Sequence, residues 1–259
     1  MPALTEAATR AMNTRLCWLG LAIILVAAAI LRLHAISASS LWFDEAISWH
    51  QASQAFSTMI RLTAMEKQPP LHNLILYVVI GAFGDSETSL RLPSAILGVV
   101  TVAAIFWVGT LIGGRATGFL SAALLCLSVF HIQYSQDARP YALLALTSTL
   151  FAGATIRALE TSRRGWHAAS SIAALLLLYS HAYGALLWIS VAIAVIASAK
   201  VWREPSPQVV LRWAIGQAIA LLLFLPWAGI LAWHYKQIVT GGLWIPKPSP
   251  RYMLGLLAS

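Results

Sequence analysis

Long apolar runs alternate with short polar segments along most of this chain. A transmembrane helix needs about 20 apolar residues, with roughly 17 as the lower limit. Seven complete runs are close to or above that length: 16–33, 92–112, 116–133, 141–159, 166–179, 183–199 and 213–233. The fifth run is short, but the stretch 166–199 carries no charge, and a break at 180–184 divides it into a tight helical hairpin. The pattern therefore predicts an all-α, polytopic membrane helix bundle with about seven complete transmembrane helices.

Two further apolar stretches complete the predicted topology. The segment 71–83 has 13 residues, a length that suits an interfacial helix better than a crossing. An eighth run begins at Tyr252 and stops at Ser259, so we expect the sequence to be truncated. We interpret residues 1–259 as a single transmembrane domain in which 34–91 form an extracytoplasmic loop with juxtamembrane helices.

The charged positions indicate which side each loop faces. If 71–83 does not cross and the N-terminus is cytoplasmic, Arg163, Arg164, Lys200 and Arg203 lie in short inner loops, as the positive-inside rule favours. A crossing at 71–83 would place all four outside. The alternative for the first run is a cleaved signal peptide, but its apolar part exceeds the 7–15 residues of such segments. We therefore expect a multi-pass protein of the plasma (inner) membrane.

Composition supports this class. Hydrophobic residues make up 59% of the chain and charged residues only 10%, against about 45–50% and 25% in soluble domains. A water-soluble enzyme or a disordered chain would not have so little charge. The net charge of +8 comes from basic residues that stand singly or in pairs, which indicates contact with membrane lipids and no nucleic acid.

Acidic and histidine side chains gather on the predicted outer side. The adjacent Asp44 and Glu45 follow the first run. In the functional interpretation Asp44 is a general base, and Glu45 orients the acceptor or binds a metal. In the alternative, the two acids only cap a juxtamembrane helix. Both roles are compatible, because a capping Asp still presents a second oxygen.

Two other outer segments carry candidate chemistry. Lys67 and His72 flank a pair of prolines, where they could meet a phosphate or a sugar or simply begin a helix. Asp137 and Arg139 precede Tyr141, which indicates either a phosphate-binding arginine opposite the Asp44 pair or a local ion pair within an interfacial aromatic belt. His181 lies in the turn of the predicted hairpin and is a weaker candidate for substrate binding.

Four motifs occur in an order that resembles a known family. They are Trp42-Phe43-Asp44-Glu45-Ala46, Lys67-Gln68-Pro69-Pro70-Leu71, Ser89-Leu90-Arg91-Leu92-Pro93-Ser94-Ala95, and Tyr134-Ser135-Gln136-Asp137-Ala138-Arg139-Pro140-Tyr141. This order resembles the polytopic GT-C glycosyltransferases, specifically the bacterial dolichyl-phosphate-mannose-protein mannosyltransferase-like group that includes the aminoarabinose transferases of lipid A. Family members usually continue through several more helices than this chain has.

The resemblance implies an inverting transfer of a sugar from a polyprenyl-phosphate-linked donor to a glycan, lipid or protein hydroxyl outside the cytoplasm. It implies Asp44 as the catalytic base, and Arg139 and Lys67 as contacts to the donor phosphate. Glu45 and Asp137 complete the candidate catalytic acids. His72, Tyr141 and His181 are the candidates for substrate binding. Relatives differ in their use of Mg²⁺ or Mn²⁺, so a divalent cation stays open as a cofactor.

Two other functions compete with this interpretation. A polytopic transporter or lipid flippase would place ionisable residues near the middle of the bilayer, whereas here the acids lie at one face. An inactive, truncated paralogue would keep the family motifs without turnover.

Overall fold

The computed structural model describes residues 2–201 and 205–241, which form helices joined by short turns. The helices in these two ranges are α1 (Pro2–Leu33), α2 (Phe43–Ala52), α3 (Phe56–Met65), α4 (Leu71–Phe83), α5 (Glu87–Leu127), α6 (Val129–Ser135), α7 (Tyr141–Thr161), α8 (Arg164–Ser180), α9 (Gly184–Val201) and α10 (Pro207–Gly241). No strand occurs in this part of the chain, which confirms the all-α prediction for it. The eighth apolar run, 252–259, lies outside the described residues.

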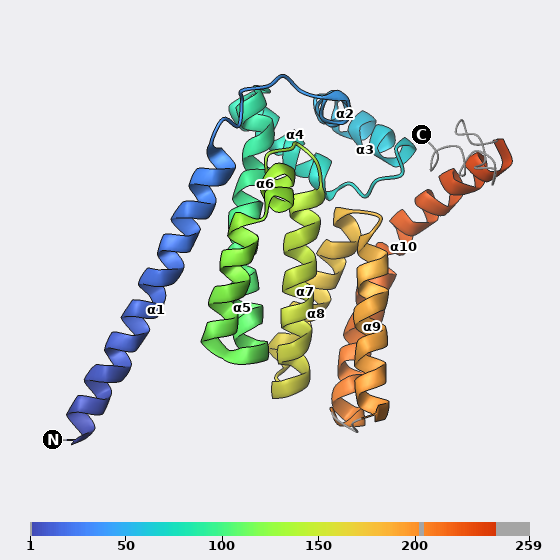
Figure 1. Cartoon of the computed structure of the whole chain (residues 1–259). Coiled ribbons are helices and arrows are strands. Elements are labelled where there is room, and N and C mark those ends of the chain that lie inside the picture. Colours follow the sequence, from blue (N-terminus) through green and yellow to red (C-terminus); the bar gives the residue numbers. More distant parts are fainter. Residues whose placement is uncertain (1, 202–204, 242–259) are drawn as a thin grey trace, which may run out of the picture.

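Long helices run between two ends of the molecule, and the short helices α2, α3, α4 and α6 gather at one of them (Figure 1). In chain order α1 rises to this end, α5 leaves it and returns, α7 descends, α8 rises and α9 descends again (Figure 1). The loops after α1, α6 and α8 therefore share one end. The α7–α8 turn lies at the opposite end, together with the start of α1.

The predicted count of seven crossings is not confirmed. Among the described residues, four helical segments are long and apolar enough to span a membrane: Arg15–Leu33, Glu87–Leu127, Tyr141–Thr161 and Pro207–Trp233. The difference has two causes. The second and third predicted runs lie largely in the two arms of α5, which are joined through a reversal and count as one helical segment, while α8 and the apolar part of α9 are shorter than 18 residues.

The helix α5 reverses direction at two glycines. Gly113 and Gly114 leave helical geometry, and Gly114 takes a φ of 79°, a conformation that side chains other than glycine rarely adopt. The two arms touch closely near this turn, since a Cβ placed on Gly109 would lie 2.9 Å from the Cα of Gly118. The returning arm ends at Leu127 and α6 begins anew, so the predicted run 116–133 is not one helix.

The predicted interfacial helix 71–83 coincides with α4, Leu71–Phe83. This helix has 13 residues and lies beside α2 and α3 at the end where the short helices gather (Figure 1). It contacts α2 and α5 through a small apolar cluster of Ala52, Leu76, Leu90 and Ala138. This cluster forms the base on which the loops of that end rest.

A buried arginine fixes the end of α1. Arg32 is fully buried and donates hydrogen bonds to the carbonyl oxygens of Ala28, Leu125 and Cys126 at 3.1–3.4 Å. Its Nη2 also lies 2.8 Å from Nδ1 of His131, which must accept because a guanidinium only donates. The arginine thus caps the last carbonyls of α5 and ties α1, α5 and α6 together just before the chain enters the linker to α2.

The predicted sidedness can be tested by cysteine labelling. In a variant with Cys17 and Cys126 replaced by alanine, Ala55→Cys and Ala182→Cys should react with a membrane-impermeant thiol reagent applied outside intact cells, whereas Gly165→Cys should not. All three positions are exposed, and the first two lie at the end of the short helices while Gly165 lies at the other. Labelling of all three after membrane disruption is the control. A reaction at Gly165→Cys in intact cells would contradict the topology.

Candidate active site

The helix α2 separates two adjacent acids by its periodicity. Asp44, Ser48 and Gln51 are spaced four and three residues apart, so they lie on one face of the helix, and all three line a pocket. Glu45 is one residue further along, a rotation of about 100°, and points into the protein, where it is fully buried. The carboxylate of Asp44 therefore faces the pocket, whereas that of the adjacent Glu45 faces the protein interior.

Glu45 forms a buried, bidentate ion pair with Arg91 of α5. The Nε and Nη2 of Arg91 lie 2.8 and 2.7 Å from Oε1 and Oε2 of Glu45. The backbone N–H of Ala138 donates to Oε1 at 2.8 Å, and that of Trp42 donates to Oε2 at 3.2 Å. Burial opposes the charge of Glu45, but the hydrogen bonds from Arg91 and the two backbone donors outweigh it and lower the pKa of this carboxyl.

These contacts give Glu45 a role other than the predicted one. The sequence predicted that Glu45 orients the acceptor or binds a metal. In the structure both of its carboxylate oxygens accept hydrogen bonds from donors of the protein, and Glu45 does not line the pocket. The physical reason is the helical phase, which turns Glu45 toward α5 rather than toward the pocket. Glu45 is a positioning residue that holds α2 against α5 and the α6–α7 loop.

Arg91 was missed as a site residue, although it belongs to one of the four family-like motifs. Besides Glu45, its guanidinium donates to the carbonyl oxygens of Ile36, Ser39 and Ser40 at 2.8, 2.9 and 3.1 Å. A single buried side chain thereby holds the α1–α2 linker against the start of α5. In the sequence, Arg91 is distinguished only as the single charged residue of the motif 89–95.

The peptide group on each side of Ala138 is held by a buried side chain. Glu45 accepts from its N–H, and Nε2 of His72 lies 3.0 Å from its carbonyl oxygen. The carbonyl can only accept, so His72 carries its proton on Nε2 when neutral. Burial, together with the positive charge of Arg139, lowers the pKa of His72 to about 4. The α6–α7 loop is thus fixed immediately before Arg139.

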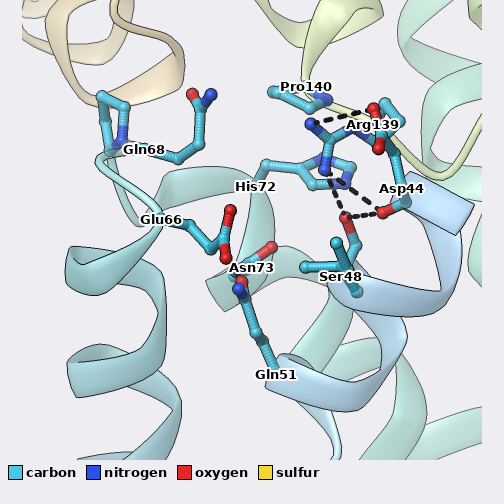
Figure 2. A pocket seen from close by; sticks show the side chains of 11 residues that line it. Asp44, Ser48, Gln51, Glu66, Gln68, His72, Asn73, Arg139 and Pro140 are labelled. Carbon is cyan, nitrogen blue, oxygen red and sulfur yellow. Dashed lines mark hydrogen bonds and ion pairs between the residues drawn. The ribbon is translucent and has the colours of Figure 1, made fainter. Parts of the chain in front are cut away.

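Arg139 extends from this loop to α2. Its Nη1 donates to the carbonyl oxygen of Asp44 at 3.2 Å and to Oγ of Ser48 at 3.1 Å, and its Nη2 lies 3.8 Å from the Asp44 carboxylate. Figure 2 shows these side chains meeting at the mouth of the pocket. The Nε of Arg139 is buried and has no hydrogen-bond partner among the residues that the structure describes. The sequence predicted that Asp44 and Arg139 face each other across a gap wide enough for a sugar; in the structure the two side chains meet in direct contact instead.

The pocket beneath this contact is small and polar. It has a volume of about 50 Å³, room for a few water molecules, and is lined by Asp44, Ile47, Ser48, Gln51, Glu66, Gln68, Pro69, His72, Asn73, Arg139 and Pro140. These residues come from α2, the α3–α4 loop, α4 and the α6–α7 loop (Figure 2). Asp44, His72 and Arg139 are the predicted site residues that line it.

The other predicted residues surround the pocket without lining it. Lys67 is exposed on the α3–α4 loop, between Glu66 and Gln68, which do line it. Tyr141 and His181 are ring neighbours with centroids 5.7 Å apart, and His181 accepts the backbone N–H of Tyr183 at 3.0 Å. Burial lowers the pKa of His181, and so does the charge of Arg139.

Asp137 provides a test of the local electrostatics. Desolvation and the charge of Glu45 raise its pKa from 3.8 to about 6. Between these values the folded chain binds more protons than the unfolded chain, so stability should fall as the pH rises from 3.8 to about 6. Asp137→Asn should therefore raise the melting temperature in detergent at pH 7.5 but hardly at pH 4. Glu160→Gln, which removes an exposed acid at the opposite end, controls for the lost charge. An equal gain at both pH values would contradict the assignment.

The acids of this region do not form a metal site in the described ranges. Within residues 2–201 and 205–241, no group of three or more His, Cys, Asp or Glu side chains is arranged to hold a metal ion. Glu45, one of the three expected ligands, already has both oxygens bonded to donors of the protein. Glu45 is therefore not available as a ligand, and a divalent cation held by Asp44 and Asp137 stays a prediction.

A comparison with known families shows which family the chain belongs to. Residues 67–230, more than half of the chain, match the family described as dolichyl-phosphate-mannose-protein mannosyltransferase. The chain belongs to this family. A membrane glycosyltransferase of the GT-C type is the function that this family supports. No curated protein matches the chain.

The family match covers only part of the candidate site. His72, Arg139 and the pocket-lining residues of α4 lie within residues 67–230, whereas Asp44 and the rest of α2 precede them. The contact between Asp44 and Arg139 therefore joins the matched part of the chain to the part before it.

Proposed function

We propose that this chain transfers a sugar from a polyprenyl-phosphate-linked donor to an extracytoplasmic hydroxyl, with inversion at the anomeric carbon. The observation that carries the proposal is the meeting of the Asp44 carboxylate and the Arg139 guanidinium in one pocket, at the end of the bundle where the short helices gather. A donor whose tail lies in the bilayer presents its sugar phosphate at such an end. Family membership supports the reaction class.

Arg139 changes partners in this mechanism. It holds Asp44 when the site is empty of donor, and the phosphate of the donor takes over its Nη groups and its unpartnered Nε. A planar guanidinium suits the paired oxygens of a phosphate. Exchange of partners releases Asp44 toward the acceptor and also widens the pocket, which must expand from about 50 Å³ to admit a sugar ring.

The chemical step is a single displacement. The acceptor oxygen forms a bond to the anomeric carbon while the bond from that carbon to the phosphate oxygen breaks. The acceptor proton passes to the Asp44 carboxylate, and the electron pair of the broken bond stays on the polyprenyl phosphate. Arg139 stabilises the negative charge that develops there.

Other predicted residues of this region assist the reaction. Lys67 supplies a second cation on the exposed α3–α4 loop, from which its flexible side chain can reach the donor phosphate. His72 stays neutral near pH 7 and holds the loop that carries Arg139. Tyr141 and His181 form an aromatic rim beside that loop, where a sugar ring or the first isoprene units can stack.

The test is a transfer assay with the chain in proteoliposomes. A polyprenyl-phosphate mannose with a labelled sugar is incorporated, and the label is followed into a glycan, lipid or protein acceptor fraction. We expect label to leave the carrier lipid in a chain-dependent manner. A flippase would move the intact donor across the bilayer without losing label from it, and that result would overturn the proposal.

Arg139→Lys should weaken donor use while the chain stays folded. Lysine keeps the charge but loses the fork that contacts Asp44, Ser48 and the phosphate. We expect the KM for the donor to rise about tenfold, in line with one charge-assisted hydrogen bond of roughly 1.5 kcal/mol. Arg157→Lys, in an exposed ion pair at the opposite end, is the matched control. An unchanged KM would remove Arg139 from the phosphate site.

A further inference from the structure

One wall of the pocket is made of three carboxamide side chains. Gln51 belongs to α2, Asn73 to α4 and Gln68 to the loop before α4, and all three line the pocket (Figure 2). Gln51 and Asn73 are each only 6% exposed. We call these residues the carboxamide wall. None of them was a candidate in the sequence analysis, and the mechanism above does not use them.

Hydrogen bonds fix the direction in which two of the amides point. The hydroxyl of Thr63 donates to the carbonyl oxygen of Met59 at 2.9 Å, so its oxygen is an acceptor toward Asn73. Nδ2 of Asn73 donates to this oxygen at 2.7 Å and to Oε1 of Gln51 at 2.6 Å. Both N–H groups of Asn73 and the carbonyl of Gln51 are thereby used within the protein.

The remaining groups of the carboxamide wall are left for a ligand. Within the described part of the chain, no residue bonds Nε2 of Gln51 or Oδ1 of Asn73. Oε1 of Gln68 is buried and likewise has no partner among the described residues. The wall therefore offers two N–H donors next to two carbonyl acceptors. An unsatisfied buried polar group is costly, so the buried Oε1 of Gln68 indicates that a ligand with a hydrogen-bond donor completes this bond.

We propose that the carboxamide wall binds the ring hydroxyls of the transferred sugar and determines which epimer is accepted. This inference rests on the proposed function. A hydroxyl both donates and accepts, so adjacent ring hydroxyls match N–H donors beside two carbonyl acceptors. A phosphate does not fit this wall, because it has no proton for the carbonyl oxygens and would lie near the Glu66 carboxylate. The phosphate belongs at Arg139, and the sugar bonded to it then reaches the wall of the same small pocket.

Sites built to hydrogen-bond a substrate hydroxyl discriminate strongly against analogues that lack it or misplace it, because buried partners are then left unpaired. The loss of one such neutral hydrogen bond should change selectivity by up to about tenfold. The change should be confined to the sugar part of the donor, since the wall is separate from the phosphate contact.

The experiment compares Gln51→Met and Gln68→Met with wild type. Methionine keeps the length of glutamine and removes the amide. Donors carrying mannose, its C2 epimer or its C4 epimer on the same polyprenyl phosphate are compared by kcat/KM. We expect the preference among epimers to shrink by up to about tenfold in each variant. Gln133→Met, on the exposed side of α6, should leave the preference as in wild type. Equal losses for all three donors, or an unchanged preference, would overturn the inference.

A binding measurement separates this inference from the proposed function. Tryptophan fluorescence reports the dissociation constants of polyprenyl-phosphate mannose and of polyprenyl phosphate without a sugar, in the absence of acceptor. In wild type, polyprenyl-phosphate mannose should bind more tightly than polyprenyl phosphate without a sugar. This difference in affinity should be smaller in Gln51→Met and Gln68→Met, while all three proteins should bind the sugar-free lipid equally well. If the benefit of the sugar persists in both variants, the carboxamide wall does not bind it. If wild type shows this difference in binding but transfers no sugar, the proposed function is wrong and the sugar-binding role of the carboxamide wall stands.

Discussion

Replacement of Asp44 by Asn should lower the rate of sugar transfer by about 10²–10⁴-fold, the usual contribution of a general base. The amide keeps the size of the carboxyl group but cannot take the proton of the acceptor hydroxyl. Binding of the donor should change little, because Arg139 also bonds the backbone carbonyl of Asp44 and the hydroxyl of Ser48. Initial rates with labelled donor, together with donor binding by fluorescence, measure the two effects separately.

The control for this variant is Glu160→Gln, which removes a carboxylate at the opposite end of the molecule and should leave the rate unchanged. Asp44→Glu should retain part of the activity, since it keeps the base but moves it by one methylene. If Asp44→Asn transfers sugar at the wild-type rate, Asp44 is not the base and the proposed mechanism is wrong.

Glu45→Ala should cost about 3–5 kcal/mol of unfolding free energy, the usual effect of removing one partner of a buried ion pair. The substitution leaves the Arg91 guanidinium buried without its carboxylate and frees the N–H of Ala138. Arg91→Met should have a similar effect, because Glu45 and the linker carbonyls then lose their donors. Thermal or denaturant unfolding in detergent measures the change.

An exposed ion pair of the same residue types provides the comparison. Arg157 and Glu160 lie 3.3 Å apart on α7 and are both partly exposed, so Arg157→Met should cost no more than about 1 kcal/mol. If Glu45→Ala and Arg157→Met destabilise the chain equally, the Glu45–Arg91 pair does not hold the site together. A loss of unfolding free energy well below about 3 kcal/mol for both Glu45→Ala and Arg91→Met would also show that this ion pair does not hold the site together.

The sequence predicted the helices better than their number of crossings. The bounds of α4 were predicted correctly, because an apolar run between Pro70 and Gly84 leaves little choice of register. The reversal inside α5 was predicted, because Gly113 and Gly114 interrupt the apolar pattern between the runs 92–112 and 116–133, and both glycines leave helical geometry there. The break before α6 depends on the Ser128 cap within an uninterrupted apolar run, and hydropathy does not reveal it.

The candidate site was predicted in part. Asp44, His72 and Arg139 were expected at one end of the bundle because charged residues are costly inside a membrane, and the structure places all three around one pocket. The role of Glu45 could not be derived, because it depends on which face of α2 meets Arg91. Gln51, Gln68 and Asn73 carry no charge and belong to no recognisable spacing, so only their packing shows that they meet.

Glu45 and His72 both hold main-chain atoms of Ala138 rather than a side chain. The number of residues in the α6–α7 connection is therefore constrained more tightly than the type of residue at each of its positions. Any small residue at 138 can keep both bonds, whereas an insertion or deletion between Tyr134 and Tyr141 would shift the peptide out of reach and displace Arg139 with it. Among homologous chains, we expect this connection to vary in composition but to keep a constant number of residues.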